Sequence, residues 1–145
     1  MKQLEQLLNR EVANLGVLYV KLHNYHWYVK GPNFFGLHVK FEELYDSITE
    51  LYDLIAELML SLNLKPVTTL KGYLEVATIA EASGNPDACE MVSNLIKDFN
   101  LLKIEFKQVI EVGDTLGLSE VSDVLTPQIT ELSKLNWMLN AVLEK

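Results

Sequence analysis

The sequence predicts an all-α protein, a bundle of four long helices in which one long connection separates the second helix from the third. Apolar residues recur at every third or fourth position through four long segments, as they do on the buried face of a helix. No segment shows the apolar–polar alternation of a half-buried strand. The chain has 145 residues, of which 49% are hydrophobic. This is enough for a sizeable core, so we expect one domain over residues 1–145.

The first two helices are expected over residues of about 3–29 and 34–63. Gly31, Pro32 and Asn33 separate them, because glycine and proline do not continue a helix without cost. The apolar stripe of the first helix consists of Leu4, Leu8, Leu15, Leu18, Leu22, Tyr25 and Val29. The second helix carries the unbroken seam of a bundle helix, formed by Phe34, Leu37, Phe41, Leu44, Ile48, Leu51, Ile55, Leu58 and Leu62.

A connection of some twenty residues follows the second helix, from Pro66 to Pro86. Within it a short helix is expected over residues 69–77, with Thr68 or Thr69 as its N-cap. The third and fourth helices are expected over about 87–112 and 119–144. Pro127 lies inside the last segment, so that helix either begins late or kinks there. Four long helices with a crossover between the second and third are typical of a ferritin-like bundle.

Charge and composition narrow the possible functions. The formal net charge is -8 and the pI is about 4.8, which disfavours binding to phosphate backbones and favours attraction of cations. No apolar run approaches the ~20 residues that span a bilayer. The first residues lack the pattern of a signal peptide, so we expect a cytoplasmic protein without membrane contact. The single Cys89 excludes a disulfide within the chain.

Residues 23–57 combine imidazoles and carboxylates at helical spacing. His38 and Glu42 are four residues apart, as are Asp53 and Glu57, so each pair shares a helix face. Imidazole with carboxylate, without thiolate, suits iron or another first-row metal. Taken one at a time, a histidine of this set is better explained as a hydrogen-bonded residue at a helix surface, and a carboxylate can be explained as a solvated helix charge. The candidates are His23, His26, His38, Glu42, Asp53 and Glu57.

The spacing of these candidates predicts a site between subunits. A metal site inside one bundle needs ligands from all four helices, but the third and fourth segments contain no histidine. Glu42 and Asp53 share a face of the second helix, yet they lie roughly 16 Å apart along its axis. Two antiparallel copies of this helix about a two-fold axis would bring His38 and Glu42 of one chain to Asp53 and Glu57 of the other.

A second stripe on the same helix supports such a contact. It consists of Phe35, His38, Glu42, Tyr45, Thr49, Tyr52, Ala56 and Met59. A helix in a monomeric bundle needs one apolar face only, so a second face of aromatic and small residues indicates coverage by a partner subunit. The alternative is a set of scattered exposed apolar residues, which any protein surface carries.

Four stretches of the sequence resemble the Dps family, the mini-ferritins known as DNA-binding proteins from starved cells. They are Lys21–Tyr45, Asp53–Glu57, Pro66–Lys71 and, more weakly, Asn136–Val142. The resemblance implies a dodecameric shell that oxidises Fe(II), commonly with hydrogen peroxide, and stores the ferric iron as a mineral. It also implies protection from oxidative damage. Iron is then the expected metal, and the expected activity is that of a ferroxidase.

The resemblance also assigns roles to individual residues. His26, His38 and Glu42 of one subunit and Asp53 and Glu57 of its two-fold mate would be both the metal ligands and the catalytic residues. Glu57 would bridge or chelate, His26 and Asp53 would complete the tighter site, and His38 and Glu42 would hold the weaker second metal. Trp27, beside His26, could be an electron donor or radical trap, or could equally pack at the interface, and His23 could lie behind the ligands without being one of them. Acidic residues near the junction of the third and fourth helices could line a pore through which iron enters. The pore candidates are Asp114, Glu120 and Asp123.

The chain departs from the family pattern at three places. Leu58 and Asn63 stand where many relatives have arginine and glycine, and the N-terminus lacks a basic extension. We therefore expect no appreciable DNA binding. Two alternatives remain. One is a structural shell that binds DNA or another partner and whose metal chemistry is incidental. The other is a small helical interaction protein without a cavity, which particle size would distinguish.

Overall fold

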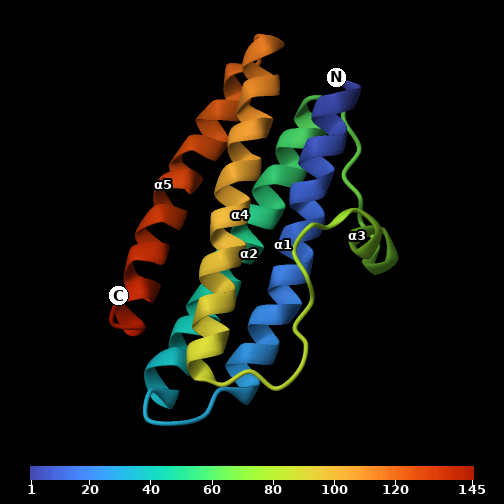
Figure 1. The fold of residues 1–145 in the computed structure, drawn as a ribbon. Coiled ribbons are helices and arrows are strands. Elements are labelled where there is room, and N and C mark those ends of the chain that lie inside the picture. Colours follow the sequence, from blue (N-terminus) through green and yellow to red (C-terminus); the bar gives the residue numbers. More distant parts are fainter.

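The computed structural model describes residues 1–145 as five α-helices without a strand (Figure 1), which confirms the predicted all-α class. Four long helices form the bundle, and α1 packs mainly against α2 while α4 packs against α5. The short α3 lies outside the bundle beside α1, within the connection that runs back from the end of α2 to the start of α4. The helices are α1 (Lys2–Tyr28), α2 (Phe34–Ser61), α3 (Leu70–Val76), α4 (Ala88–Thr115) and α5 (Ser119–Val142).

The predicted apolar stripes form the core. Thirty-one buried hydrophobic residues make one continuous cluster drawn from all five helices. Phe34 and Leu62, at the two ends of the predicted seam of α2, are half-buried and pack against this cluster. Val142, at the end of α5, is 40% exposed and lines an open groove between the start of α2 and the end of α5. Met59, assigned above to the second stripe of α2, is fully buried and belongs to the core. No helix is long and apolar enough to cross a membrane.

Helix boundaries follow local chemistry. Thr69 caps α3 by accepting a 3.0 Å hydrogen bond from the Gly72 amide at Oγ1, which selects Thr69 over Thr68. After α2 ends, Asn63 has a φ of 62°. Asparagine is among the few residues other than glycine that adopt this left-handed conformation readily, which explains why the chain does without the usual glycine here.

The second half differs from prediction in two details. The third predicted helix was expected to end near residue 112, but α4 continues to Thr115 and includes Gly113. A Cβ at Gly113 would lie 2.9 Å from the Val121 side chain, so this glycine allows α4 and α5 to approach closely rather than ending the helix. The last helix does not begin late, because α5 starts at Ser119 and continues through Pro127.

Polar side chains of α1 hold the crossover connection to the bundle. Before α3, Glu5 accepts a 2.8 Å hydrogen bond from the Lys65 amide, and Asn9 accepts one of 2.7 Å from the Val67 amide. Asn9 also donates to the Lys65 carbonyl at 2.9 Å. The connection therefore has fixed partners for its backbone groups, as a long segment without secondary structure requires.

Helix α3 docks onto the bundle through one aromatic residue. Tyr73 is buried, and its hydroxyl is hydrogen-bonded to that of Tyr52 on α2. Its ring lies over Gly16 of α1, where an added Cβ would be 2.7 Å from Tyr73 Cδ2. Leu70 and Leu74 of α3 remain exposed.

Candidate metal centre

His26 and His38 face each other where α1 gives way to α2. Their rings are stacked, with centroids 3.7 Å apart and planes inclined by 9°. Each Nδ1 is hydrogen-bonded to the other residue's backbone carbonyl oxygen, at 2.6 Å for His26 and 2.7 Å for His38. The His26 carbonyl is free to accept because it lies in the last turn of α1. The short turn between the helices thus fixes both imidazoles.

This reciprocal bonding determines which nitrogen of each ring can bind a metal. A carbonyl oxygen only accepts, so Nδ1 must carry the hydrogen in both rings. In a neutral imidazole the Nε2 lone pair is then free, and a backbone carbonyl is a common partner for the distal N–H of a metal-bound histidine. The sequence did not identify these acceptors. The structure supplies one for each ring.

Glu42 follows His38 by one helical turn and reaches the same place. Its Oε1 lies 3.7 Å from His26 Nε2, which is too far for a good hydrogen bond. Two atoms that each bind one metal ion at about 2.1 Å lie about 3.4–3.6 Å apart at ordinary bond angles. His26 is almost buried, whereas the Glu42 side chain is 54% exposed. His26, His38 and Glu42 therefore lie together at the surface of the bundle, without forming a three-ligand site by themselves.

Aromatic rings enclose the histidine pair. Phe34 stacks beside His38 with centroids 5.0 Å apart, and Tyr45 meets His26 edge-on at 5.5 Å. Desolvation, and then the charges of Glu42 and Asp46, raise the pKa of Tyr45 above its ordinary value. These contacts restrict the rings to one orientation, which lowers the entropy lost when they bind a ligand.

Asp53 and Glu57 lie elsewhere on α2. Both are exposed, and neither forms an ion pair within the chain. They follow Glu42 by eleven and fifteen residues in one continuous helix, so Asp53 is roughly 16 Å further along its axis. No group of three or more histidine, cysteine, aspartate or glutamate side chains in the single chain is arranged to hold a metal ion. The placement of Asp53 and Glu57 in a site shared with a second subunit stays a prediction.

His23 and Trp27 adjoin the pair without joining it. His23 Nδ1 donates to the Tyr19 carbonyl at 2.7 Å, and its ring stacks on Tyr45 with centroids 3.8 Å apart. Trp27 is 67% exposed and meets His23 edge-on at 5.5 Å. In the second stripe of α2, Phe35 is exposed and Tyr45 is half-buried.

Sequence reasoning missed a set of charged residues inside the bundle. Glu11 and Glu105 are 0% and 4% exposed, and Lys21 forms a 2.8 Å ion pair with Asp98. The sequence pattern contains no clear signal for them. Asp98 and Glu105 directly precede the core residues Phe99 and Phe106, and Glu11 directly precedes the core residue Val12. Each therefore lies at the edge of an unbroken apolar stripe, where a charged side chain is usually solvated.

Comparison with known proteins agrees with this architecture. The ferritin-like domain family matches residues 5–145. General stress protein 20U of Bacillus subtilis is 46% identical over 142 residues, 98% of each chain. The crystal structure of a Dps protein from Bacillus brevis matches with a TM-score of 0.96 and 47% identity, over 98% of this chain and 95% of that one. A Dps protein from Vibrio cholerae O1, described as a member of a superfamily of ferritin-like diiron-carboxylate proteins, matches with a TM-score of 0.94 and 34% identity, over 98% and 89% of the two chains. The chain therefore belongs to the Dps family of ferritin-like proteins.

Proposed function

We propose that this protein is an iron-oxidising and iron-storing mini-ferritin. It binds Fe(II) at sites shared by two subunits, oxidises it with hydrogen peroxide, and stores the ferric product in the cavity of a dodecamer. One observation carries the proposal. His26 and His38 present two oriented Nε2 atoms, and Glu42 lies 3.7 Å from one of them. The similarity to a protein described as diiron-carboxylate favours iron as the metal.

A two-fold mate would supply the carboxylates that the single chain lacks near this group. Asp53 and Glu57 are exposed and unpaired on the same helix, and antiparallel pairing of two α2 helices places them opposite the histidines. Glu57 then bridges or chelates, with His26 and Asp53 at the tighter position and His38 and Glu42 at the weaker one. Symmetry gives two such sites per dimer.

The donor set suits the proposed reaction. Two Fe(II) ions lose one electron each, and peroxide takes up both electrons as its O–O bond breaks. Hydrolysis of the ferric ions to oxyhydroxide then releases protons to water. Carboxylates and neutral imidazoles stabilise the higher charge of the ferric product. Removal of Fe(II) and peroxide together would protect the cell from hydroxyl radicals.

Charge favours a role with cations over a role with DNA. The chain carries a net charge of -8, which repels phosphate backbones and attracts Fe(II). We therefore infer a cytoplasmic iron protein that does not bind DNA appreciably at physiological salt. A gel-shift assay in which the protein retards plasmid DNA under those conditions would contradict this inference.

A test of activity compares the wild type with Glu57→Ala and a matched control. Glu111→Ala removes an exposed carboxylate of α4 that forms no ion pair within the chain. Fe(II) is loaded anaerobically, peroxide is added, and near-ultraviolet ferric absorbance and the size of the iron-bearing particle are followed. We expect rapid oxidation with iron in a dodecamer for the wild type and the control, and slow oxidation for Glu57→Ala. A dodecamer that neither oxidises nor retains iron would favour the structural-shell alternative.

A mixing experiment tests whether the site is shared. His26→Ala and Asp53→Ala subunits are each expected to be inactive as homo-oligomers. When they are co-expressed in equal amounts, half of the dimers contain both variants, and each of these has one intact site. About one quarter of the wild-type activity should return. A site formed within one subunit would give no recovery, because every such site would lack one ligand.

A further inference from the structure

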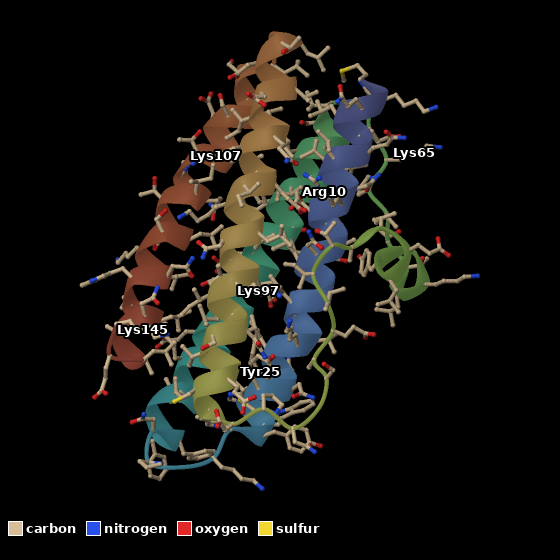
Figure 2. All side chains as sticks on the ribbon, in the orientation of Figure 1. Arg10, Tyr25, Lys65, Lys97, Lys107 and Lys145 are labelled. Atoms are coloured by element: carbon tan, nitrogen blue, oxygen red, sulfur yellow. The ribbon has the colours of Figure 1, made fainter.

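A buried acidic pair lies at the contact between α1 and α4, away from the candidate metal centre. Glu11 of α1 is fully buried and Glu105 of α4 is 4% exposed. Arg10 Nε lies 2.7 Å from Glu11 Oε2 and 3.2 Å from Glu105 Oε1. Arg10, labelled in Figure 2, reaches across to α4, where its Nη2 donates to Gln108 at 3.0 Å. Two carboxyl groups therefore share one guanidinium group.

The crossover connection closes this pair from the outside. Thr78 Oγ1 donates to the Glu105 carboxylate, 2.8 Å from Oε2 and 3.0 Å from Oε1. The Thr78 and Ile79 amides donate to Asn14 Oδ1 at 2.7 and 2.9 Å. Asn14 Nδ2 in turn donates to Glu105 Oε1 at 2.9 Å. The backbone of residues 78–79 and the buried carboxyl groups thus belong to one hydrogen-bond network.

The partners of the two carboxyl groups differ. Glu105 receives hydrogen bonds from Asn14 and Thr78 and lies beside Arg10. Glu11 has Arg10 as its one close donor, with Asn14 Nδ2 at 3.5 Å. Burial, and then the charge of Glu105, raise the pKa of Glu11 to about 8, although Arg10 opposes the rise. Glu105 and Arg10 are the charged groups that face Glu11, and α2, α3 and the connection add none.

We propose that Glu11, Glu105, Arg10, Asn14 and Thr78 form a proton-operated latch, which holds the crossover connection closed while Glu11 is protonated and releases it when that proton is lost. With the proton present, one carboxylate and one guanidinium balance each other. Without it, two buried carboxylates share one guanidinium, and the excess negative charge must gain access to water.

Of the elements around this pair, the crossover connection is the one that can move away. Helices α1 and α4 are joined by the apolar core on both sides of the pair, including the fully buried Leu8 and Leu102. Residues 78–80 are held by the hydrogen bonds of Asn14, Glu105 and Lys21 and by the side chain of Ile79, which is 4% exposed and belongs to the core. Opening would loosen the segment that carries α3 and would leave the four long helices in place.

The direction of the pH dependence follows from the raised pKa. In the folded chain Glu11 keeps its proton up to about pH 8, whereas a solvated carboxyl loses it near its ordinary value of 4.5. The latch is therefore most stable below that ordinary value and weakens as pH rises toward 8. Between pH 4.5 and about pH 8 the equilibrium constant for opening should increase by about tenfold per pH unit. Above about pH 8 it should be constant.

Hydrogen–deuterium exchange of the peptide that contains Thr78 and Ile79 measures the opening directly. Rates are divided by those of an unstructured peptide at each pH, which removes the intrinsic base catalysis. In the wild type the corrected rate should rise about tenfold per pH unit from about pH 5 and level off above about pH 8. In Glu11→Gln it should be independent of pH, because glutamine donates to Glu105 as the protonated acid does. The control Glu111→Gln should behave as the wild type.

Two results would overturn the proposal. One is the same pH dependence in Glu11→Gln as in the wild type. The other comes from the wild type alone and so does not depend on the folding of a variant: infrared spectra that show no protonated carboxyl group at neutral pH. We expect such a band at neutral pH, and its loss as exchange at residues 78–79 increases.

Discussion

Replacing Lys21 with methionine should destabilise the fold by an amount that depends on pH, because Asp98 then remains buried without its cation. Lys21 Nζ lies 2.8 Å from Asp98 Oδ2, and the two side chains are 6% and 10% exposed. Lys21 also donates a 2.8 Å hydrogen bond to the carbonyl of Ala80 in the crossover connection. Methionine retains much of the apolar stem and removes the charge.

The cost of this change has an upper bound, because an unpaired buried carboxylate takes up a proton instead of remaining ionised. The ordinary pKa of the Asp98 carboxyl is 3.8, and burial raises it in the wild type while Lys21 opposes the rise. At about 1.4 kcal/mol per pH unit, keeping Asp98 protonated costs about 4 kcal/mol at pH 7 and about 2 kcal/mol at pH 5. The lost hydrogen bond to Ala80 adds about 1 kcal/mol at either pH.

The sign of the pH dependence is fixed by proton binding. In Lys21→Met the folded chain binds a proton at Asp98 that the unfolded chain has released above its ordinary pKa, so the free energy of unfolding falls as pH rises. Urea unfolding at both pH values, at one protein concentration, measures the difference from the wild type. The double variant Lys21→Met/Asp98→Asn should be less destabilised than Lys21→Met at pH 7. Its loss relative to the wild type should be the same at pH 5 as at pH 7. An equal loss for Lys21→Met at both pH values would refute the reasoning.

Three further changes test other contacts. Gly16→Ala places a Cβ 2.7 Å from the Tyr73 ring and should displace α3, so tryptic cleavage after Lys71 should accelerate; an unchanged rate would contradict the docking role of Tyr73. Asp87→Ala removes the capping box of α4 and should lower the free energy of unfolding by about 1 kcal/mol in urea titrations, whereas no loss would mean that the cap is dispensable. Asp123→Asn should slow iron uptake several-fold but spare peroxide-driven oxidation of iron already bound; an equal loss of both would exclude a pore role.

The fold was predictable because its determinants are local. Apolar periodicity located the four long helices within a few residues, and the threonine at position 69 located the short one. The boundary errors came from reading glycine as a helix breaker. Gly113 lies in the last turn of α4, where Val121 of α5 packs closely against it, and such a close approach between helices is not visible in a local sequence pattern.

The candidate site was predictable in part. Helical spacing grouped His38 with Glu42, and both lie together in the structure with His26. The reciprocal hydrogen bonds between the two histidines were not predictable, since they depend on how the turn after α1 directs α2. The buried network of Glu11 and Glu105 was also missed, because each lies beside a core residue, Val12 or Phe106, at the edge of an unbroken apolar stripe, and only the packing of α4 on α1 buries it.

That buried network bears on why the metal chemistry is proposed at the bundle surface. Carboxylates that face each other from two helices inside a bundle can serve as ligands of a carboxylate metal site. Glu11 and Glu105 have this arrangement. Their oxygens, however, are committed to Arg10, Asn14 and Thr78. The guanidinium already supplies the positive charge that a metal would bring, and the chain's three histidines lie near the α1–α2 turn. The interior pair therefore organises the fold, while the donors with free lone pairs remain at the surface of α2, where a second subunit can complete them.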